Sequence, residues 1–258
     1  MRKILAICFA TILLATTVNA QEFCNNLQSW YYNPNDRNEP PTAQEQLNLA
    51  DFDAYYLGDT RKKDIYLTFD EGYENGYTAP ILDVLRDKNV PAAFFVTKTY
   101  ITANPDLVRR MVDEGHIVGN HTVRHKSSPD LTCDELREEL EKTANAYQEL
   151  INAEMPPFFR PPMGEYSERV LRTTQDCGYS TIFWSFAYVD WNINKQPGRD
   201  FALKKVVDNI HNGAILLLHA VSESNAQAMG DIVDALRAMG YEFKSLYDLK
   251  EEFGRGIL

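Results

Sequence analysis

Short apolar strands alternate with helical segments along most of this chain, and this alternation limits the folds that it can adopt. Seven segments are predicted as strands: residues 65–69, 92–96, 116–120, 158–160, 180–184, 214–218 and 241–244. The segments between them carry helix signals, such as the capping box expected for Thr132 and Glu135. Strands that alternate with helices form parallel βα units. We therefore expect an α/β barrel one unit short of the eight-stranded one, with a doubly wound open sheet as the alternative.

The length of the chain and its first residues indicate how it is divided into segments and domains. The 258 residues suffice for a single barrel domain. Residues 1–20 contain a basic start and an apolar run shorter than the ~20 residues of a spanning helix, so they are predicted as a secretory signal peptide. An uncleaved membrane anchor is the alternative. Residues 21–63 are polar and proline-containing and are predicted as an extended N-terminal arm laid on the domain, which then spans residues 64–253.

Charge and cysteine content argue against several classes of protein. The net charge is −11, which makes nucleic acid and anionic surfaces poor partners. After the signal peptide is removed, Cys24, Cys133 and Cys177 remain, without a close Cys-x-x-Cys spacing. We expect buried or partly bridged thiols and no cysteine metal cluster.

Polar residues follow five of the predicted strands, and the first of these strands ends in two acids. The five residues are Asp70, His121, Arg160, Asp190 and His219. In a parallel barrel these strand ends open on one face, where active sites lie. Successive side chains of a strand point to opposite sides, so Asp70 and Glu71 are expected to have different roles, one as a general base and the other toward a metal or a supporting partner. A solvated strand end is the alternative.

Histidines supply candidate metal ligands and a candidate acid. His121 and His125 are four residues apart, and on one helical turn both imidazoles can reach one metal ion. With Asp70 or Glu71 they would form a site with open positions for water, as hydrolytic zinc sites do. His219 directly follows an apolar strand and can act as a general acid, with a structural histidine as the alternative.

Two further segments carry residues suited to catalysis and sugar binding. Prolines stiffen the loop that begins at Arg160, whose guanidinium can pair with Asp70, while the N–H of Met163 can point at an oxyanion. A surface arginine beside a rigid loop is the alternative. Asp190 and Trp191 add an acid and an aromatic ring of the kind that stacks on sugars, although a tryptophan in the core is an equal alternative.

Taken in order, these segments resemble the motifs of a known family. The matching residues are 68–72, 121–125, 160–162, 190–191 and 216–219. They look like the five motifs of the polysaccharide deacetylases, also called the NodB-homology or family 4 carbohydrate esterases. Residues 73–78, 183–191 and 219–222 look closest to the δ-lactam-biosynthetic de-N-acetylases of the spore cortex, and the likeness runs from about residue 30 to residue 249.

The resemblance implies a distorted (β/α)7 barrel and a NodB-like catalytic domain over residues 64–253. Such a domain hydrolyses an N-acetyl group of a cell-wall sugar and releases acetate. By analogy, Asp70 is the general base on a metal-bound water, and His121, His125 and Glu71 are ligands of a divalent metal, expected to be zinc.

The resemblance also assigns the remaining catalytic roles. Arg160 orients the base, the Met163 amide completes the oxyanion hole and His219 is the general acid for the departing amine. Substrate binding is assigned to three residues: Asp190, Trp191 and Tyr166.

Two positions depart from the family pattern. Most relatives have aspartate where this chain has Glu71, whose longer side chain is expected to change the geometry at the metal. Relatives also commonly have an acid three residues before Asp190 that tunes the histidine acid, and here Ala187 stands at that position. The spore branch shares this second loss.

We therefore expect an exported, monomeric peptidoglycan N-deacetylase without a protein partner, located in the cell wall or spore cortex. The spore branch acts on muramic acid residues freed of peptide, and the amine that it releases closes a muramic δ-lactam. A deacetylase of N-acetylglucosamine polymers and an O-acetyl esterase are the enzyme alternatives. A carbohydrate-binding protein with a decayed site is an alternative of another class. A glycoside hydrolase is disfavoured because its two carboxylates must flank a sugar bond ~5–9.5 Å apart.

Overall fold

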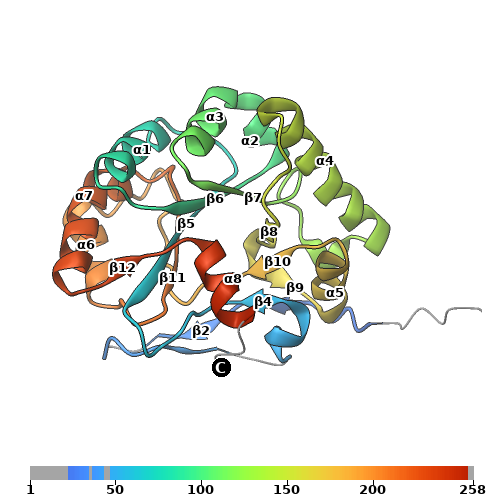
Figure 1. The fold of residues 1–258 in the computed structure, drawn as a ribbon, viewed down its shortest axis with the longest axis horizontal. Helices are drawn as coiled ribbons and strands as arrows, with labels where there is room; N and C mark the ends of the chain where they lie inside the picture. The colour runs from blue at the N-terminus through green and yellow to red at the C-terminus, as the bar shows by residue number, and fades with distance from the viewer. Residues whose placement is uncertain (1–22, 35–36, 44–46, 255–258) are drawn as a thin grey trace, which may run out of the picture.

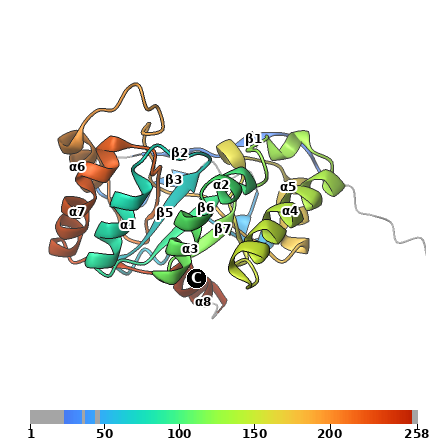
Figure 2. The ribbon, with the colours of Figure 1, turned by 90° about the horizontal axis from the view of Figure 1, so that it is seen from above.

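The structure is a computed structural model that describes residues 23–34, 37–43 and 47–254. The predicted signal peptide, residues 1–20, lies outside these residues. Figure 1 shows helices arranged around a curved sheet, and Figure 2 shows that the N-terminal strands and the last helix lie at opposite ends of this barrel.

The main sheet is parallel, and its strands follow the order β11-β5-β6-β7-β8-β10-β4, with β12 beside β5. Its strands are β4 (Ala54–Tyr55), β5 (Asp64–Glu71), β6 (Ala92–Val96), β7 (Ile117–Asn120), β8 (Phe158–Phe159), β10 (Ser180–Ile182), β11 (Ile215–Leu218) and β12 (Glu242–Phe243). Isolated bridges at Phe186 with Leu216 and at Leu57 with Ala214 join the β10 and β4 side of the sheet to the β11 side. The seven predicted strands and the distorted (β/α)7 barrel are confirmed.

The helices cover the outside of the barrel, as Figure 1 shows. They are α1 (Thr78–Asp87), α2 (Lys98–Ala103), α3 (Pro105–Asp113), α4 (Cys133–Ile151), α5 (Glu168–Asp176), α6 (Arg199–Val207), α7 (Glu223–Ala238) and α8 (Leu246–Gly254). Single 3-10 turns occur at η1 (Leu49–Phe52), η2 (Ser128–Asp130) and η3 (Pro162–Gly164). Helix α8 packs at the end of the barrel where the strands begin.

Strand β5 is buried from Ile65 to Glu71, as expected for a central parallel strand covered on both faces. On its core side, the rings of Phe69 and Phe94 stack with centroids 5.0 Å apart. The two acids therefore lie at the end of a fully packed strand. Because both carboxylates are buried, the free-energy cost of their charge depends on the partner that each one has.

Helix α4 positions the loop that carries the paired histidines. Its predicted capping box is confirmed: the Glu135 N–H donates to Thr132 Oγ1 at 3.2 Å, and the Thr132 N–H donates to Glu135 Oε2 at 2.8 Å. One turn further, Glu139 Oε2 accepts a hydrogen bond from the Val123 N–H at 2.7 Å. The helix thus fixes the backbone between His121 and His125.

The N-terminal segment lies across the end of the barrel where the strands finish (Figure 2). It contains β1 (Gln28–Ser29), β2 (Tyr32–Asn33) and β3 (Thr42–Ala43), and β1 pairs antiparallel with β9 (Glu165–Tyr166). Its later part is more than an arm, because β4 joins the main sheet in parallel with β10. A strand of two residues has too few side chains to show an alternating pattern, so the sequence did not reveal it.

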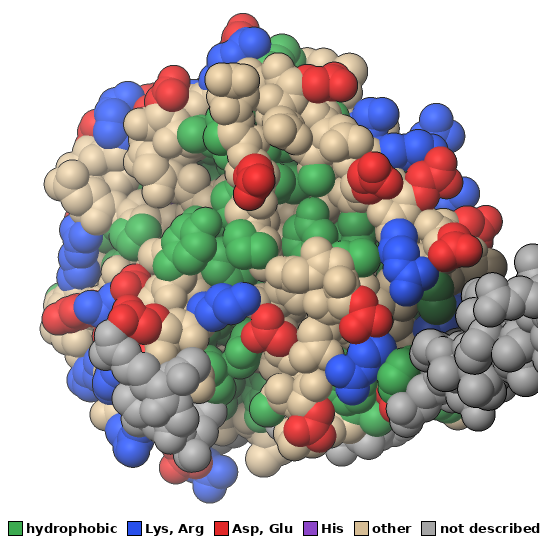
Figure 3. Space-filling model, turned by 45° about the vertical axis from the view of Figure 1, so that its right-hand side comes forward, with side chains coloured by type: hydrophobic (Ala, Val, Ile, Leu, Met, Phe, Trp, Pro, Cys, Tyr) green, Lys and Arg blue, Asp and Glu red, His purple; other side chains and the backbone are tan. Residues whose placement is uncertain are grey.

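Charged side chains of both signs are interspersed on the face of the molecule shown in Figure 3, and Lys and Arg do not gather into a patch there. Within the described ranges, every helix is too short or too polar to cross a bilayer.

Candidate active site

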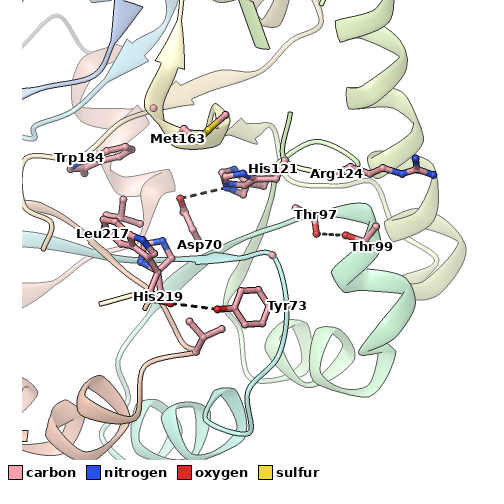
Figure 4. A pocket seen from close by; sticks show the side chains of 15 residues that line it. Asp70, Tyr73, Thr97, Thr99, His121, Arg124, Met163, Trp184, Leu217 and His219 are labelled. Atoms are coloured by element: carbon pink, nitrogen blue, oxygen red, sulfur yellow. Dashed lines mark hydrogen bonds and ion pairs between the residues drawn. The ribbon is translucent and has the colours of Figure 1, made fainter. Parts of the chain in front are cut away.

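A cavity of about 590 Å³ opens where the barrel strands end, and Figure 4 shows Asp70 between His121 and His219 inside it. Its volume falls in the range of small-molecule sites. The lining residues are Asp70, Gly72, Tyr73, Thr97, Thr99, His121, Arg124, His125, Met163, Gly164, Trp184, Trp191, Leu217, His219 and Val221. The structure thus brings together most of the residues that the sequence placed at strand ends.

Arg160 holds the Asp70 carboxylate from beneath the cavity. Its Nη1 donates to Asp70 Oδ1 and to Thr68 Oγ1, each at 2.8 Å, and its Nε donates to the carbonyl of Ile182 at 2.9 Å. Burial would raise the pKa of Asp70, but the positive charge of Arg160 lowers this pKa below its usual value. Asp70 is therefore ionised and oriented, as a general base requires.

His121 presents a free ring nitrogen to the cavity. Its Nδ1 donates to the carbonyl of Arg160 at 2.7 Å, which leaves Nε2 as a lone-pair acceptor 3.6 Å from Asp70 Oδ2. This Nε2 is buried and has no hydrogen-bond partner among the described residues. Burial lowers the pKa of His121 to about 4, so the ring is neutral at neutral pH.

His125 lies beside His121, although not for the predicted reason. The two ring centroids are 4.8 Å apart. Residues 121–125 form a turn with positive φ angles at Thr122 and His125, and not a helical turn. The prediction that the two imidazoles share one side is confirmed, and the predicted backbone is wrong.

His219 forms a tight pair with Asp190. Its Nδ1 donates to Asp190 Oδ1 at 2.7 Å, and its backbone N–H donates to Asp190 Oδ2 at 2.8 Å. Burial alone would lower the pKa of His219, but the Asp190 carboxylate and its hydrogen bond raise the pKa above the usual value. The ring is thus held with Nε2 away from Asp190, and the raised pKa makes the ring easier to protonate, as a general acid requires.

The assignment of Asp190 to substrate binding is corrected by this geometry. The residue is fully buried and uses both carboxylate oxygens on His219. Ala187 leaves no acid three residues before Asp190, and in this chain Asp190 itself is the carboxylate that is hydrogen-bonded to His219.

Trp191 and Met163 stand at the rim of the cavity. Trp191 is 49% exposed, and its ring lies edge-on to His219 with centroids 5.4 Å apart. Met163 is 53% exposed and adopts the left-handed backbone conformation with φ 59°. Both positions suit contact with a bound sugar and its acetamido group.

Tyr166 lies outside the cavity, and its assignment to substrate binding is wrong. Its ring is 2% exposed and packs against Trp30 and Phe183, with centroid distances of 6.4 and 5.0 Å. Tyr166 is the second residue of β9, which directly follows Gly164, and the pairing of β9 with β1 holds this side chain in the interior.

Glu71 also lies outside the cavity, and its assignment as a metal ligand is wrong. Its side chain is fully buried, and neither carboxylate oxygen has a hydrogen-bond partner among the described residues. Burial, followed by the nearby carboxylates of Glu74, Asp70 and Asp190, raises its pKa well above the usual value. The alternation of side chains along β5 explains this position, because Asp70 already faces the cavity.

The donor atoms fit a divalent metal only in part. The unpartnered Nε2 of His121 and the neighbouring ring of His125 suit a metal ion. The described residues contain no group of three or more His, Cys, Asp or Glu that is arranged to hold a metal. Among the described residues, the two neighbouring imidazoles are therefore the donors that could hold a metal ion, while the buried Glu71 carboxylate lies outside the cavity.

Several lining residues were missed from the sequence. Thr97 directly follows β6, so the rule that strand ends build the site would have identified it. Tyr73, Arg124 and Trp184 lie in irregular segments, where no periodic signal indicates which side chain faces the cavity.

The site defines a hydrolase in which a carboxylate with a lowered pKa and an imidazole with a raised pKa lie on two sides of one cavity. The comparisons with known proteins are consistent with this class. The family model for polysaccharide deacetylases matches residues 57–182. Over 255 residues the chain is 42% identical to the peptidoglycan-N-acetylmuramic acid deacetylase PdaA of Bacillus subtilis, with 98% of this chain and 97% of that protein covered.

Solved structures agree with the sequence comparison. The structure of Bacillus subtilis PdaA, a family 4 carbohydrate esterase, matches with a TM-score of 0.86 at 43% identity and covers 89% of this chain and 99% of that one. A family 4 pseudoenzyme from Bacillus anthracis matches with a TM-score of 0.72 at 30% identity, over 81% and 72% of the two chains. The chain belongs to the polysaccharide deacetylase family, whose deacetylases are metal-dependent hydrolases.

Proposed function

We propose that this protein removes the acetyl group from N-acetylmuramic acid residues of peptidoglycan strands. The Bacillus subtilis relative, which aligns with nearly the whole chain, is a peptidoglycan-N-acetylmuramic acid deacetylase, and this supports the substrate. One observation carries the reaction: Asp70 and His219 line the same cavity, and the pKa of the carboxyl is lowered while that of the imidazole is raised. The product amine can then condense with the lactyl carboxyl group, with loss of one water, to form the muramic δ-lactam of the spore cortex.

The reaction requires two proton transfers, one to Asp70 and one from His219. Asp70 takes a proton from the attacking water as its oxygen bonds to the acetyl carbon. The Met163 N–H faces the oxyanion that develops on the acetyl oxygen. His219 Nε2–H gives its proton to the amide nitrogen as the carbon–nitrogen bond breaks, which yields acetate and a free amine.

His121 and His125 would hold the metal on which this family depends. We propose zinc because neutral imidazole suits this ion. A bound divalent cation supplies Lewis-acid polarisation of the acetyl carbonyl and of water. The low pKa of His121 keeps its ring neutral and available as a ligand at neutral pH.

Acetate release from two substrates tests the proposed function. Purified protein is assayed on glycan strands stripped of peptide and, in parallel, on chitin oligomers. We expect release from the muramic acid strands, and release from chitin alone would contradict the muramic acid assignment in favour of a glucosamine deacetylase.

The match to a pseudoenzyme makes a decayed binding protein the second candidate. The Asp70→Asn variant separates the two, because this isosteric change removes the base and keeps the shape of the cavity. Equal glycan binding by wild type and variant, with no acetate from either, would favour the binding protein.

We also propose that the protein acts outside the cytoplasm, on the basis of the signal-like residues 1–20. Sequencing the N-terminus of the exported protein should give a start near Gln21. A start at Met1 on a membrane-bound protein would instead indicate an uncleaved anchor.

A further inference from the structure

Asn225 supports the Asp190 carboxylate from helix α7. Its Nδ2 donates to Asp190 Oδ2 at 2.6 Å and to the carbonyl of His219 at 3.2 Å. Its Oδ1 accepts a hydrogen bond from the Tyr188 hydroxyl. The side chain is fully buried in the first turn of α7. The amide of Asn225 therefore links Asp190, His219 and Tyr188.

Gln196 fixes the same loop from its other end. Its Nε2 donates to the carbonyls of Asp190 and Asn192 at 2.9 and 3.0 Å. Its Oε1 accepts from Ser222 Oγ at 2.7 Å and from the Ser224 N–H at 3.1 Å. These four bonds use both donors and both lone pairs of the amide, so the loop is tied to the start of α7 with no polar atom left over.

We propose that Asn225 and Gln196 are positioning residues of the deacetylation reaction. Asn225 aligns Asp190 on His219, and Gln196 holds the backbone that places Trp191 over the cavity. This inference rests on the proposed function, because it assigns the pair His219 and Asp190 to protonation of the leaving amine.

The chemistry of the amide suits this task. A buried carboxylate needs its lone pairs occupied, and a neutral donor occupies one without adding a positive charge that would compete with the imidazolium. The charged or titratable groups that face His219 from the neighbouring elements are Asp190, Asp70, Arg160 and His125. Loss of Asn225 would therefore loosen the one carboxylate that is hydrogen-bonded to the acid.

Kinetics of three variants test the proposal. We expect Asn225→Ala to lower kcat at least tenfold with KM within about threefold, and to move the basic limb of the pH profile to lower pH, because a misaligned Asp190 stabilises the imidazolium less. Gln196→Ala should mainly raise KM through the displaced Trp191. Gln227→Ala is the matched control, since Gln227 is exposed on the same helix and bonds only to Glu223 among the described residues.

A second measurement does not depend on the substrate. The pKa of His219 is followed by NMR in protein that is free of substrate and from which a chelator has removed metal. This pKa should fall in Asn225→Ala and stay constant in Gln227→Ala. Asn225→Asp is the conservative variant that separates loss of the hydrogen bond from loss of folding. A protonated aspartic acid at this position can still donate to Asp190. An unchanged pKa in Asn225→Ala, or a kcat loss matched by the loss of folded protein, would overturn the proposal. If wild type fails on muramic acid strands while this pKa difference persists, only the substrate assignment fails.

Discussion

Replacement of Arg160 by lysine should lower the stability of the protein and impair Asp70 as the general base. The guanidinium is fully buried and forms four hydrogen bonds, to Asp70, Thr68 and the carbonyls of Ile182 and Phe183. Lysine keeps the positive charge, but its single nitrogen cannot replace a planar fork that reaches four acceptors.

The structure allows the cost of this substitution to be worked out. If the ammonium group remains with Asp70, the carbonyls of Ile182 and Phe183 lose their side-chain donor. A buried polar group left unsatisfied costs ~1–3 kcal/mol, so the two carbonyls cost about 2–6 kcal/mol of unfolding free energy. At ~2–4 °C per kcal/mol for a protein of this size, the Tm should fall by about 4–24 °C.

The assay combines calorimetry with a pH profile of acetate release. The variant should melt earlier, and the acid limb of its profile should move to higher pH, because a weaker partner lowers the pKa of Asp70 less. Arg169→Lys, an exchange at a partly buried arginine outside the cavity, is the control. An Arg160→Lys protein with the Tm and the acid limb of wild type would refute the reasoning.

Three further outcomes are expected. Asp190→Asn should move the basic limb of kcat/KM to lower pH, since the carboxylate that raises the pKa of His219 is gone; an unmoved limb would contradict the pairing. Because the folded-state pKa of Glu71 is raised, the contribution of this carboxyl to stability should fall with rising pH from about 4.3 upward, by at most ~1.4 kcal/mol per pH unit. The Glu71→Gln variant should lack this contribution when the free energy of urea unfolding is compared with wild type across pH. Chelation should abolish acetate release, and His121→Ala and His125→Ala should each lower the bound metal measured by mass spectrometry; full metal content in both would exclude these ligands.

The barrel could be predicted because most of its strands are recognisable in the sequence. Strand β6 is a continuous apolar run and β5 is mostly apolar up to Phe69, as expected for strands buried on both faces. The polar residues at the ends of such strands fall at the same end of the barrel. This rule correctly placed Asp70, His121 and His219 in one cavity.

The errors arose where side-chain direction depends on irregular backbone. Asp190 lies in a loop and Tyr166 belongs to the two-residue strand β9. Long-range pairing, of Asp190 with His219 and of β9 with β1, turns their side chains inward. Glu71 was assigned by analogy with relatives, although the alternation along β5 that separates it from Asp70 was visible in the sequence. The Asn225 and Gln196 bonds join segments about 30 residues apart, and no local pattern encodes such contacts.

The most direct test of the account is the rate of acetate release from peptide-free muramic acid strands by Asp70→Asn, at a pH where wild type and variant are equally folded. General base catalysis contributes ~10²–10⁴-fold, so the account predicts a loss of that size in kcat with glycan binding retained. A variant that releases acetate within a few-fold of the wild-type rate would contradict the assignment of Asp70 as the base and, with it, the mechanism proposed for this cavity.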